Sequence, residues 1–389
     1  LLGFSFAAET FYPTTIGDLE AEVKLHGTGT ISNLKIGSNV TFETLTFQES
    51  EYQKIEIIKE VLTINETTIY PEHIFDEFGN KYVKFTIEEN GAFEYELIAN
   101  VKTTALLKEL SDYEINGYPE SVEIFSKESP TVESSSNEIL TVTSNKLTST
   151  SFLTSLNETI FWVNEYVEYA SGKDFQIYYL LQKSAIDPLL SKKGVCDEFA
   201  NLAAAMLRAK GIPTRLAIGV TFDGKEWGNH AWLEVYHNQS GWIPSDPTFR
   251  EPGFVDATHI KLGSFNDVSK SLAKAVYPQG TDVLFQAQTL PQIKIIEKKY
   301  FKHANLVWEP KQLKTEQWNE ISIEITNNTS GYLTIPVKIK ENYDELLFDT
   351  KTKSISLKSG KSGIITFKIY PNIALKSSEI ATGSLTFNS

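Results

Sequence analysis

The sequence predicts an α+β protein in which a core of helices and strands lies between two β-rich regions. Polar and apolar residues alternate in short runs from Leu1 to about Ala105, and again from about Leu290 to the C-terminus, as in strands with one buried face. Between these regions, apolar residues recur at helical spacing. Because 389 residues are too many for one ordinary core, we expect three domains, at 1–105, 106–290 and 291–389.

The two flanking regions carry the pattern of antiparallel sheets. In the first, the runs Lys81–Glu88 and Ala92–Ala99 alternate after a turn around Gly79. In the last, the runs EISIEITNN, LTIPVKIKE and SGIITFKIY are separated by turn residues, which predicts a β-sandwich. The opening segment Leu1–Ala8 fits both the end of a secretory signal peptide and a first strand.

The central region begins with a connection and two helices. Residues 126–151 are rich in Ser, Thr and Glu, with little periodicity, and we expect an exposed connection there. Ser155 and Glu158 have the spacing of a capping box, so a helix should begin at this pair. Leu156, Ile160, Val163 and Val167 then define its buried face. A second helix is expected over roughly 175–184.

The stretch GVCDEFANLAAAMLRAKGIPTR, residues 194–215, contains the only cysteine of the chain. Its apolar residues follow helical spacing up to Gly211 and Pro213, which end the predicted helix. Cys196 therefore lies in the first turn, where the helix dipole favours a thiolate. Asp197 and Glu198 oppose this effect by charge repulsion, so a base is needed to activate the thiol.

A histidine and an aspartate follow at the ends of two predicted strands. His230 opens the run NHAWLEVY, residues 229–236, and an imidazole within reach of Cys196 could accept its proton. Asp246 ends the run GWIPSDPT, residues 241–248, and a carboxylate beside the imidazole would fix its tautomer. A lone cysteine is most often a buried hydrophobe, and only the combination of all three residues favours catalysis over packing.

These three motifs together resemble the transglutaminase-like superfamily over about 161–248. The resemblance implies a papain-like core, in which a helix bundle packs on an antiparallel sheet, and flanking β-sandwich domains of Ig-like type. It also implies that Cys196 is the nucleophile, His230 the base and Asp246 its orienting carboxylate.

The remaining site residues are less defined by the sequence. For the oxyanion hole, the candidates are the backbone N–H of Cys196 and the side chains of Trp162, Tyr169 and Gln176. No second ligand stands at metal-site spacing from any other histidine, so we expect no metal site and no cofactor, with calcium activation left open; these histidines are His26, His73, His237, His259 and His303.

The predicted reaction is acyl transfer from a protein or peptide amide through a cysteine thioester. Hydrolysis, as by a cysteine protease or amidase, is favoured over transglutaminase cross-linking of glutamine to amines, and a catalytically silent surface scaffold is the third alternative. The formal charge of −14 is spread along the chain and argues against nucleic acid as a partner. Six N-glycosylation sequons suit an extracellular or cell-surface protein, and surface attachment is compatible with the β-domains. The oligomeric state is left open.

Overall fold

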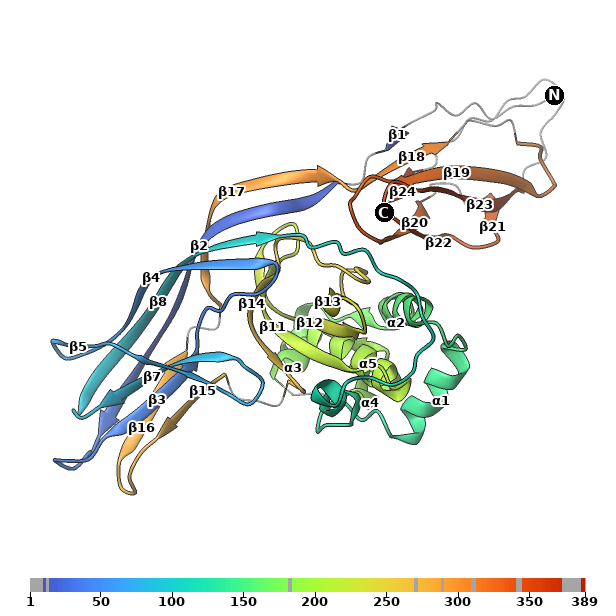
Figure 1. Cartoon of the computed structure of the whole chain (residues 1–389). Coiled ribbons are helices and arrows are strands. Elements are labelled where there is room, and N and C mark those ends of the chain that lie inside the picture. Colours follow the sequence, from blue (N-terminus) through green and yellow to red (C-terminus); the bar gives the residue numbers. More distant parts are fainter. Residues whose placement is uncertain are drawn as a thin grey trace. The chain divides into compact units, whose positions relative to one another are not determined.

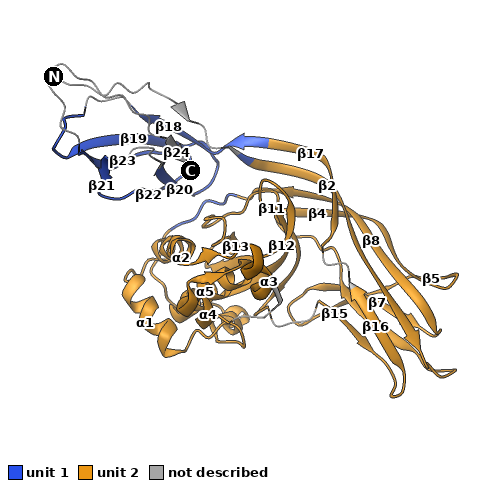
Figure 2. Cartoon of the chain, turned by 180° about the vertical axis from the view of Figure 1, so that it is seen from behind, with its two compact units in different colours: residues 1–15, 107–111, 300–389 blue, residues 16–106, 112–299 orange. Residues whose placement is uncertain are grey.

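The computed structural model describes residues 10–11, 14–180, 184–268, 272–287, 290–308, 313–340, 345–372 and 386–388. These residues form two compact units (Figure 2). One unit combines Ile16–Leu106 with Asp112–Lys299, and the other combines Leu1–Thr15, Leu107–Ser111 and Tyr300–Ser389. The β-rich first region and the mixed core, which the sequence predicted as separate domains, thus share one unit. The segment Leu1–Ala8 lies outside the described residues.

The first region forms two antiparallel sheets, which confirms its prediction as all-β. The order of one sheet is β16-β2-β8-β4-β5, with β17 also on β2, and that of the other is β15-β3-β7-β6. Their strands are β2 Thr14–Ser32, β3 Val40–Leu45, β4 Gln53–Ile64, β5 Thr67–Ile69, β6 Glu72–Phe75, β7 Lys81–Ile87, β8 Gly91–Thr104, β15 Ala273–Val276, β16 Asp282–Ala287 and β17 Gln292–Lys302.

The chain therefore returns to the first two sheets after it has completed the central core. Strand β15 pairs with β3, and β16 pairs with β2, although residues 273–287 lie next to the core in the sequence. The buried cluster of these sheets also includes Val220, Ala257 and Ile260 from the core. This shared apolar cluster explains why the two regions form one unit.

The central core is an antiparallel sheet with helices packed on it (Figure 1). The sheet has the order β13-β12-β11-β14. Helix α5 contacts β11 and β12, and also α1, α2 and α4. The elements are η1 Glu120–Ser126, α1 Asn137–Lys146, α2 Phe152–Tyr166, β9 Glu168–Tyr169, α3 Gly172–Leu180, α4 Ile186–Ser191, β10 Lys193–Gly194, α5 Cys196–Ala209, β11 Thr214–Phe222, β12 Trp227–His237, β13 Gly241–Ser245 and β14 Ile260–Phe265.

Helix α5 follows the sequence prediction in its bounds but is buried more completely. It begins at Cys196, and Gly211 follows its end with a φ of 79°, in the left-handed region that glycine adopts readily. The predicted stripe is buried, and so are Glu198–Arg208 as a whole. Small alanines at 203–205 let the sheet and the helices approach from opposite sides. The helix that carries the cysteine therefore packs against both the sheet and the neighbouring helices.

One prediction for the segment before α5 is wrong and another is confirmed. Residues 126–151 were expected to lack helices, but α1 occupies Asn137–Lys146, and Ser136 caps it by accepting from the backbone N–H of Ile139. Ile139 and Thr143 are buried one turn apart, so packing stabilises a helix whose apolar pattern is weak. The second helix, expected over roughly 175–184, is confirmed as α3 at Gly172–Leu180, and residues 181–183 lie outside the described ones.

The predicted capping box at Ser155 and Glu158 is also wrong. Helix α2 begins one turn earlier, where the side chain of Ser151 accepts from the backbone N–H of Thr154. Ser155 is buried inside the helix, and its hydroxyl donates to the carbonyl of Ser149 at 3.3 Å. The expected buried face of this helix is nevertheless confirmed, because Leu156, Ile160, Val163 and Val167 are each at most 3% exposed.

The second unit consists of strands, as the alternation predicted. Its two antiparallel sheets have the orders β1-β18-β19-β23-β21 and β22-β20-β24. The Ig-like arrangement of these strands stays a prediction. The strands are β1 Thr10–Phe11, β18 Ala304–Trp308, β19 Asn319–Asn327, β20 Leu333–Lys340, β21 Leu346–Phe348, β22 Thr352–Leu357, β23 Ser362–Pro371 and β24 Thr386–Asn388. No helix in the described ranges is long and apolar enough to cross a membrane.

Candidate active site

Cys196 is the first residue of α5, directly after the short parallel pair of β9 and β10. The side chain of Glu198 turns back and accepts from the backbone N–H of Val195 at 2.7 Å, which satisfies a donor that the first turn leaves bare. A Cβ atom at Gly194 would lie 2.4 Å from the Cβ of Glu198. The glycine before the cysteine thus leaves room for the side chain that closes the helix start.

The thiol of Cys196 is buried against strand β12. Its Sγ lies 3.9 Å from the carbonyl oxygen of Asn229 and 3.8 Å from Oδ1 of Asp197. Burial, and next the charge of Asp197, raise the pKa of the Cys196 thiol well above its usual value, and the backbone N–H of Ala231 acts in the opposite direction. The position at the start of the helix therefore does not by itself give the Cys196 thiol a low pKa.

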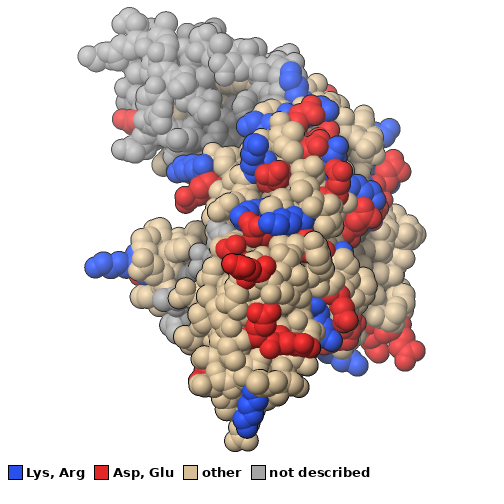
Figure 3. Space-filling model, turned by 90° about the vertical axis from the view of Figure 1, so that its left-hand side faces the viewer, with Lys and Arg blue, Asp and Glu red and all other residues tan. Residues whose placement is uncertain are grey.

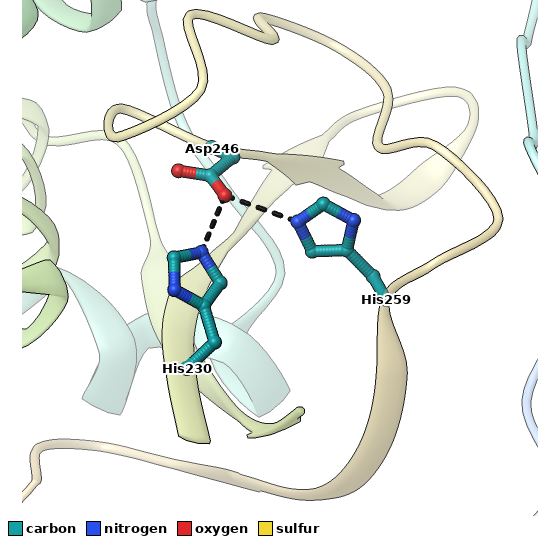
Figure 4. A group of neighbouring side chains, drawn as sticks. All are labelled: His230, Asp246 and His259. Atoms are coloured by element: carbon teal, nitrogen blue, oxygen red, sulfur yellow. Dashed lines mark hydrogen bonds and ion pairs between the residues drawn. The ribbon is translucent and has the colours of Figure 1, made fainter. Parts of the chain in front are cut away.

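His230 lies on β12, between Asn229 and Ala231, the two residues whose backbone groups contact Cys196. Its Nε2 is 2.6 Å from Oδ2 of Asp246 (Figure 4). Its ring stacks on Phe249, with 5.0 Å between centroids. Because the pKa of the Asp246 carboxylate is lowered, its oxygen accepts and Nε2 carries a proton. In the neutral imidazole, Nδ1 is then the unprotonated nitrogen, and it lies on the side of the ring away from Asp246 (Figure 4).

Asp246 follows the last residue of β13 and is completely buried. Its Oδ1 accepts from the backbone N–H groups of Thr248 at 2.6 Å and Phe249 at 3.1 Å. Burial by itself would raise the pKa of Asp246, but the charges and hydrogen bonds of His230 and His259 lower it well below its usual value. The structure thus joins His230 to Asp246 by a hydrogen bond and places Cys196 against the backbone on either side of His230.

A second histidine, His259, belongs to the same cluster and was missed by the sequence reasoning. It precedes β14, is completely buried, and places Nε2 3.0 Å from Oδ2 of Asp246 (Figure 4). Its Nδ1 lies 3.1 Å from Oδ1 of Asp256. Burial lowers the pKa of His259, but hydrogen bonds to Asp246 and Asp256 outweigh it and raise the value to about 10. No linear spacing in the sequence signals this contact, since it depends on the path of the connection between β13 and β14, which lie at opposite edges of the sheet.

His230, Asp246 and His259 are residues of types that could hold a metal ion, with one ligand atom of each within 4.8 Å of the others. Spacing along the sequence did not predict this group. The Oδ2 atom of Asp246 lies 2.6 and 3.0 Å from the two imidazole nitrogens. Ligand atoms around a tetrahedral metal ion at about 2.0–2.2 Å lie about 3.3–3.6 Å apart. The distances therefore fit shared protons better than a shared metal ion.

The candidates for the oxyanion hole fall in different places. Tyr169, in β9, is close enough to the thiol that the charge of Cys196 raises the Tyr169 pKa, although burial raises it more. Trp162 lies in α2 and stacks on Tyr166, with 4.5 Å between ring centroids. Gln176 is exposed on α3. Of the three side chains, the structure relates Tyr169 electrostatically to Cys196.

Comparisons with known proteins relate the segment that contains this site to one superfamily. The sequence model of the transglutaminase-like superfamily matches residues 141–247, which include Cys196, His230 and Asp246. A segment of 72 residues is 36% identical to the uncharacterised protein YebA of Bacillus subtilis and 35% identical to a protein-glutamine gamma-glutamyltransferase of Pseudomonas aeruginosa. Each of these matches covers 15% of this chain, which thus spans only 10% of the length of either relative.

The fold is also found among solved structures. A protein of Cytophaga hutchinsonii that is named as a candidate cysteine protease superposes with a TM-score of 0.53 and 21% sequence identity. The superposition covers 75% of this chain and 95% of that one. At this identity, the likeness shows a common fold.

Proposed function

Because residues 141–247 match the model of the transglutaminase-like superfamily, we propose that the protein is a thiol-dependent acyl-transfer enzyme acting on protein or peptide amides. The observation that carries the proposal is the 2.6 Å hydrogen bond between Nε2 of His230 and Asp246. This hydrogen bond leaves Nδ1 of His230 free to accept a proton. The residues before and after His230 in the chain, Asn229 and Ala231, contact Cys196 through their backbone. A thiol with a raised pKa needs such a base.

The residues would share the chemistry as follows. As Sγ of Cys196 attacks the amide carbonyl carbon, Nδ1 of His230 takes the thiol proton. The C–N bond of the tetrahedral intermediate then breaks, and the imidazolium gives this proton to the departing amine or ammonia, leaving a thioester. An incoming water or amine gives a proton to His230 and attacks the thioester carbon. The C–S bond breaks, and Cys196 leaves as a thiolate that takes this proton back from the imidazolium. Asp246 keeps the imidazole in one tautomer and stabilises its charged form throughout.

The negative oxygen of the tetrahedral intermediate requires donors. The backbone N–H of Cys196 at the start of α5 is one, since the first turn of a helix has N–H groups without helical partners. We assign the second donor to the phenol of Tyr169, whose pKa is raised, so that it keeps its proton at neutral pH. Trp162 and Gln176 remain the alternatives.

Water is the acceptor that we propose first, which makes the protein a cysteine protease or amidase. A transglutaminase reaction is the second candidate, and it is favoured by the 35% identity of 72 residues to the Pseudomonas aeruginosa enzyme. A silent scaffold is disfavoured, because a protein without catalysis has no need of the buried Cys196, His230 and Asp246 arrangement.

The deciding experiment supplies both acceptors at once. The protein is incubated with an unfolded glutamine-rich protein and a labelled primary amine, and the products are followed by mass spectrometry, with Cys196→Ala as the inactive control. We expect new peptide termini or deamidated glutamine that depend on Cys196. Incorporation of the amine would instead identify a transglutaminase, and products that persist in Cys196→Ala would refute the thiol mechanism.

The partner that we propose is a protein or peptide and not a nucleic acid. On the described part of the face drawn in Figure 3, Lys and Arg side chains are interspersed with Asp and Glu, without a continuous basic area. A phosphate backbone needs such an area, and the net charge of −14 opposes it.

We also propose that the protein acts outside the cell or at its surface. Of the six sequon asparagines, those at 39, 65, 238 and 328 are exposed, whereas Asn327 is buried and bonded to the carbonyls of Gly331 and Leu357. Fractionation of the native host, followed by immunodetection, is expected to find the protein in the medium or the surface fraction. Its retention in the cytosol would contradict this location.

A further inference from the structure

His259 is bonded on both sides by carboxylates. Its Nε2 lies 3.0 Å from Oδ2 of Asp246, and its Nδ1 lies 3.1 Å from Oδ1 of Asp256. An ionised carboxylate can only accept hydrogen bonds, so both ring nitrogens must carry a proton if both carboxylates are ionised. The ring would then be an imidazolium that is completely buried.

The hydrogen bonds to the two carboxylates indicate that both are ionised. Asp246 accepts from four N–H groups, two from the backbone and two from imidazoles. Oδ1 of Asp256 accepts from the backbone N–H of Thr258 at 2.8 Å and from its hydroxyl at 2.5 Å, in addition to His259. Consistent with this, the pKa of each carboxyl is lowered by its hydrogen-bond donors in spite of burial.

The charges around His259 show what the imidazolium balances. Asp246 and Asp256 are negative, and His230 contacts the ring edge-on, with 5.6 Å between centroids. Glu251 is buried nearby, and burial and the charge of Asp256 raise its pKa well above the usual value. Without the charge of His259, this pocket would hold two carboxylates in a nearly dry interior.

The charges of this cluster also affect the Cys196 thiol. The thiol is faced by the carboxylates of Asp197, Asp246 and Glu198, each of which raises its pKa, and by the phenol of Tyr169. A positive charge on the far side of Asp246 offsets part of that repulsion. The positive charge of His259 therefore lowers the pKa values at which the Cys196–His230 pair loses its protons.

We propose that His259 is a positioning residue, a permanently charged imidazolium that holds the Asp246 carboxylate toward His230 and offsets its negative charge. The role rests on the proposed function of Cys196, His230 and Asp246. It is distinct from theirs, because His259 touches neither the thiol nor the substrate carbonyl in that mechanism.

The first test needs no variant. In protein labelled with nitrogen-15 at histidine, the side-chain nitrogen signals are recorded between about pH 6.5, the ordinary histidine pKa, and about pH 9. We expect one histidine with both nitrogens protonated over the whole range, in agreement with its pKa of about 10. A His259 that carries one unprotonated nitrogen at about pH 8 would overturn the proposal.

The second test removes the charge and keeps one hydrogen bond. In His259→Gln, the side-chain amide can still donate to Asp246, whereas His259→Leu can donate nothing. His303→Gln, at a histidine of the other unit with a lowered pKa, serves as the matched control. Alkylation of Cys196 by iodoacetamide is measured against pH, and it reports on one site because the chain has a single cysteine.

We expect the alkylation profile of His259→Gln to move to higher pH by about one unit, because the loss of a positive charge makes each ionisation of the Cys196–His230 pair harder. Where substrate turnover is measurable, kcat should fall about tenfold in His259→Gln and about a hundredfold in His259→Leu, with KM unchanged. A folded His259→Gln with the wild-type profile would refute the role.

These readouts separate the two proposals. If the wild-type protein transfers no acyl group, the proposed function fails, yet the nitrogen signals and the alkylation profile still decide the state of His259. If His259→Gln does not fold, the nitrogen signals of the wild-type protein decide instead.

Discussion

Replacement of Asp246 with asparagine is expected to lower the rate of Cys196-dependent amide turnover about 10⁴-fold. The two oxygens of Asp246 accept four N–H groups, two from the backbone at Oδ1 and two from imidazoles at Oδ2. An amide has only one oxygen, so either orientation places an N–H group against other donors. If its oxygen stays with the backbone, its N–H group faces His230.

That arrangement favours the wrong tautomer of His230. An imidazole that accepts at Nε2 carries its proton on Nδ1, and it cannot take the proton of Cys196 from there. The misplaced donors should also lower the free energy of unfolding by about 1–3 kcal/mol. Steady-state turnover by Asp246→Asn is therefore compared with its thermal unfolding curve, at a temperature where the variant is folded.

The matched control is Asp223→Asn. Asp223 lies in the exposed turn between β11 and β12, and its Oδ1 accepts from the backbone N–H groups of Lys225 and Glu226. An asparagine can accept the same bonds, so turnover should not change. A folded Asp246→Asn that keeps a tenth or more of the wild-type rate would remove Asp246 from the mechanism.

The largest loss of stability is expected from Glu234→Gln. Glu234 lies on β12, where its buried carboxylate accepts from Nζ of Lys261 at 2.7 Å, Nε of Arg215 at 2.7 Å and the hydroxyl of Ser264 at 2.8 Å. The Lys261 side chain is only 7% exposed. Without the carboxylate, an uncompensated charge would remain in the interior, and the free energy of unfolding should fall by about 3–5 kcal/mol.

Urea denaturation measures this loss, with Glu20→Gln as the control. Glu20 pairs with Lys102 at 3.1 Å, but the Lys102 side chain is 61% exposed, so the same change there should cost less than about 1 kcal/mol. Equal losses in the two variants would show that the Glu234 cluster adds no stability beyond a surface ion pair.

The same cluster predicts how stability depends on pH. Burial would raise the pKa of Glu234, but the charges of Lys261 and Arg215 outweigh it and lower the pKa well below the usual value. A carboxyl with a lowered folded-state pKa contributes its full stability above the unfolded pKa of about 4.3 and loses it as the pH falls toward the folded value. The pH dependence of unfolding below about pH 4 should therefore be weaker in Glu234→Gln than in the wild-type protein.

Much of the fold follows from local patterns. The run at 81–88 contains strand β7, Lys81–Ile87, and the run at 92–99 lies within β8, because strict alternation leaves one face for the core. Helix α5 starts at Cys196, and the left-handed Gly211 follows its end. These are signals over a few residues, and short-range geometry suffices to interpret them.

Local patterns failed where packing supplied the stability. Helix α1 has a weak apolar pattern, and it forms because Ile139 and Thr143 are buried in contact with other parts of the core. The start of α2 was predicted one turn late, because serine is a common capping residue but Ser155 is buried within the helix. The residue type alone cannot distinguish a buried serine from a capping one.

The sequence by itself determined the strand-rich flanks, the helix that carries Cys196, and the three residues Cys196, His230 and Asp246 as candidates for one site. Only the tertiary structure decided that strands β15 to β17 return to the first sheets. It alone also decided that His259 lies between the carboxylates of Asp246 and Asp256. The physical reason is distance along the chain. A hydrogen bond or a strand pairing between remote segments leaves no periodicity in either segment, and it exists only when the shared core brings them together.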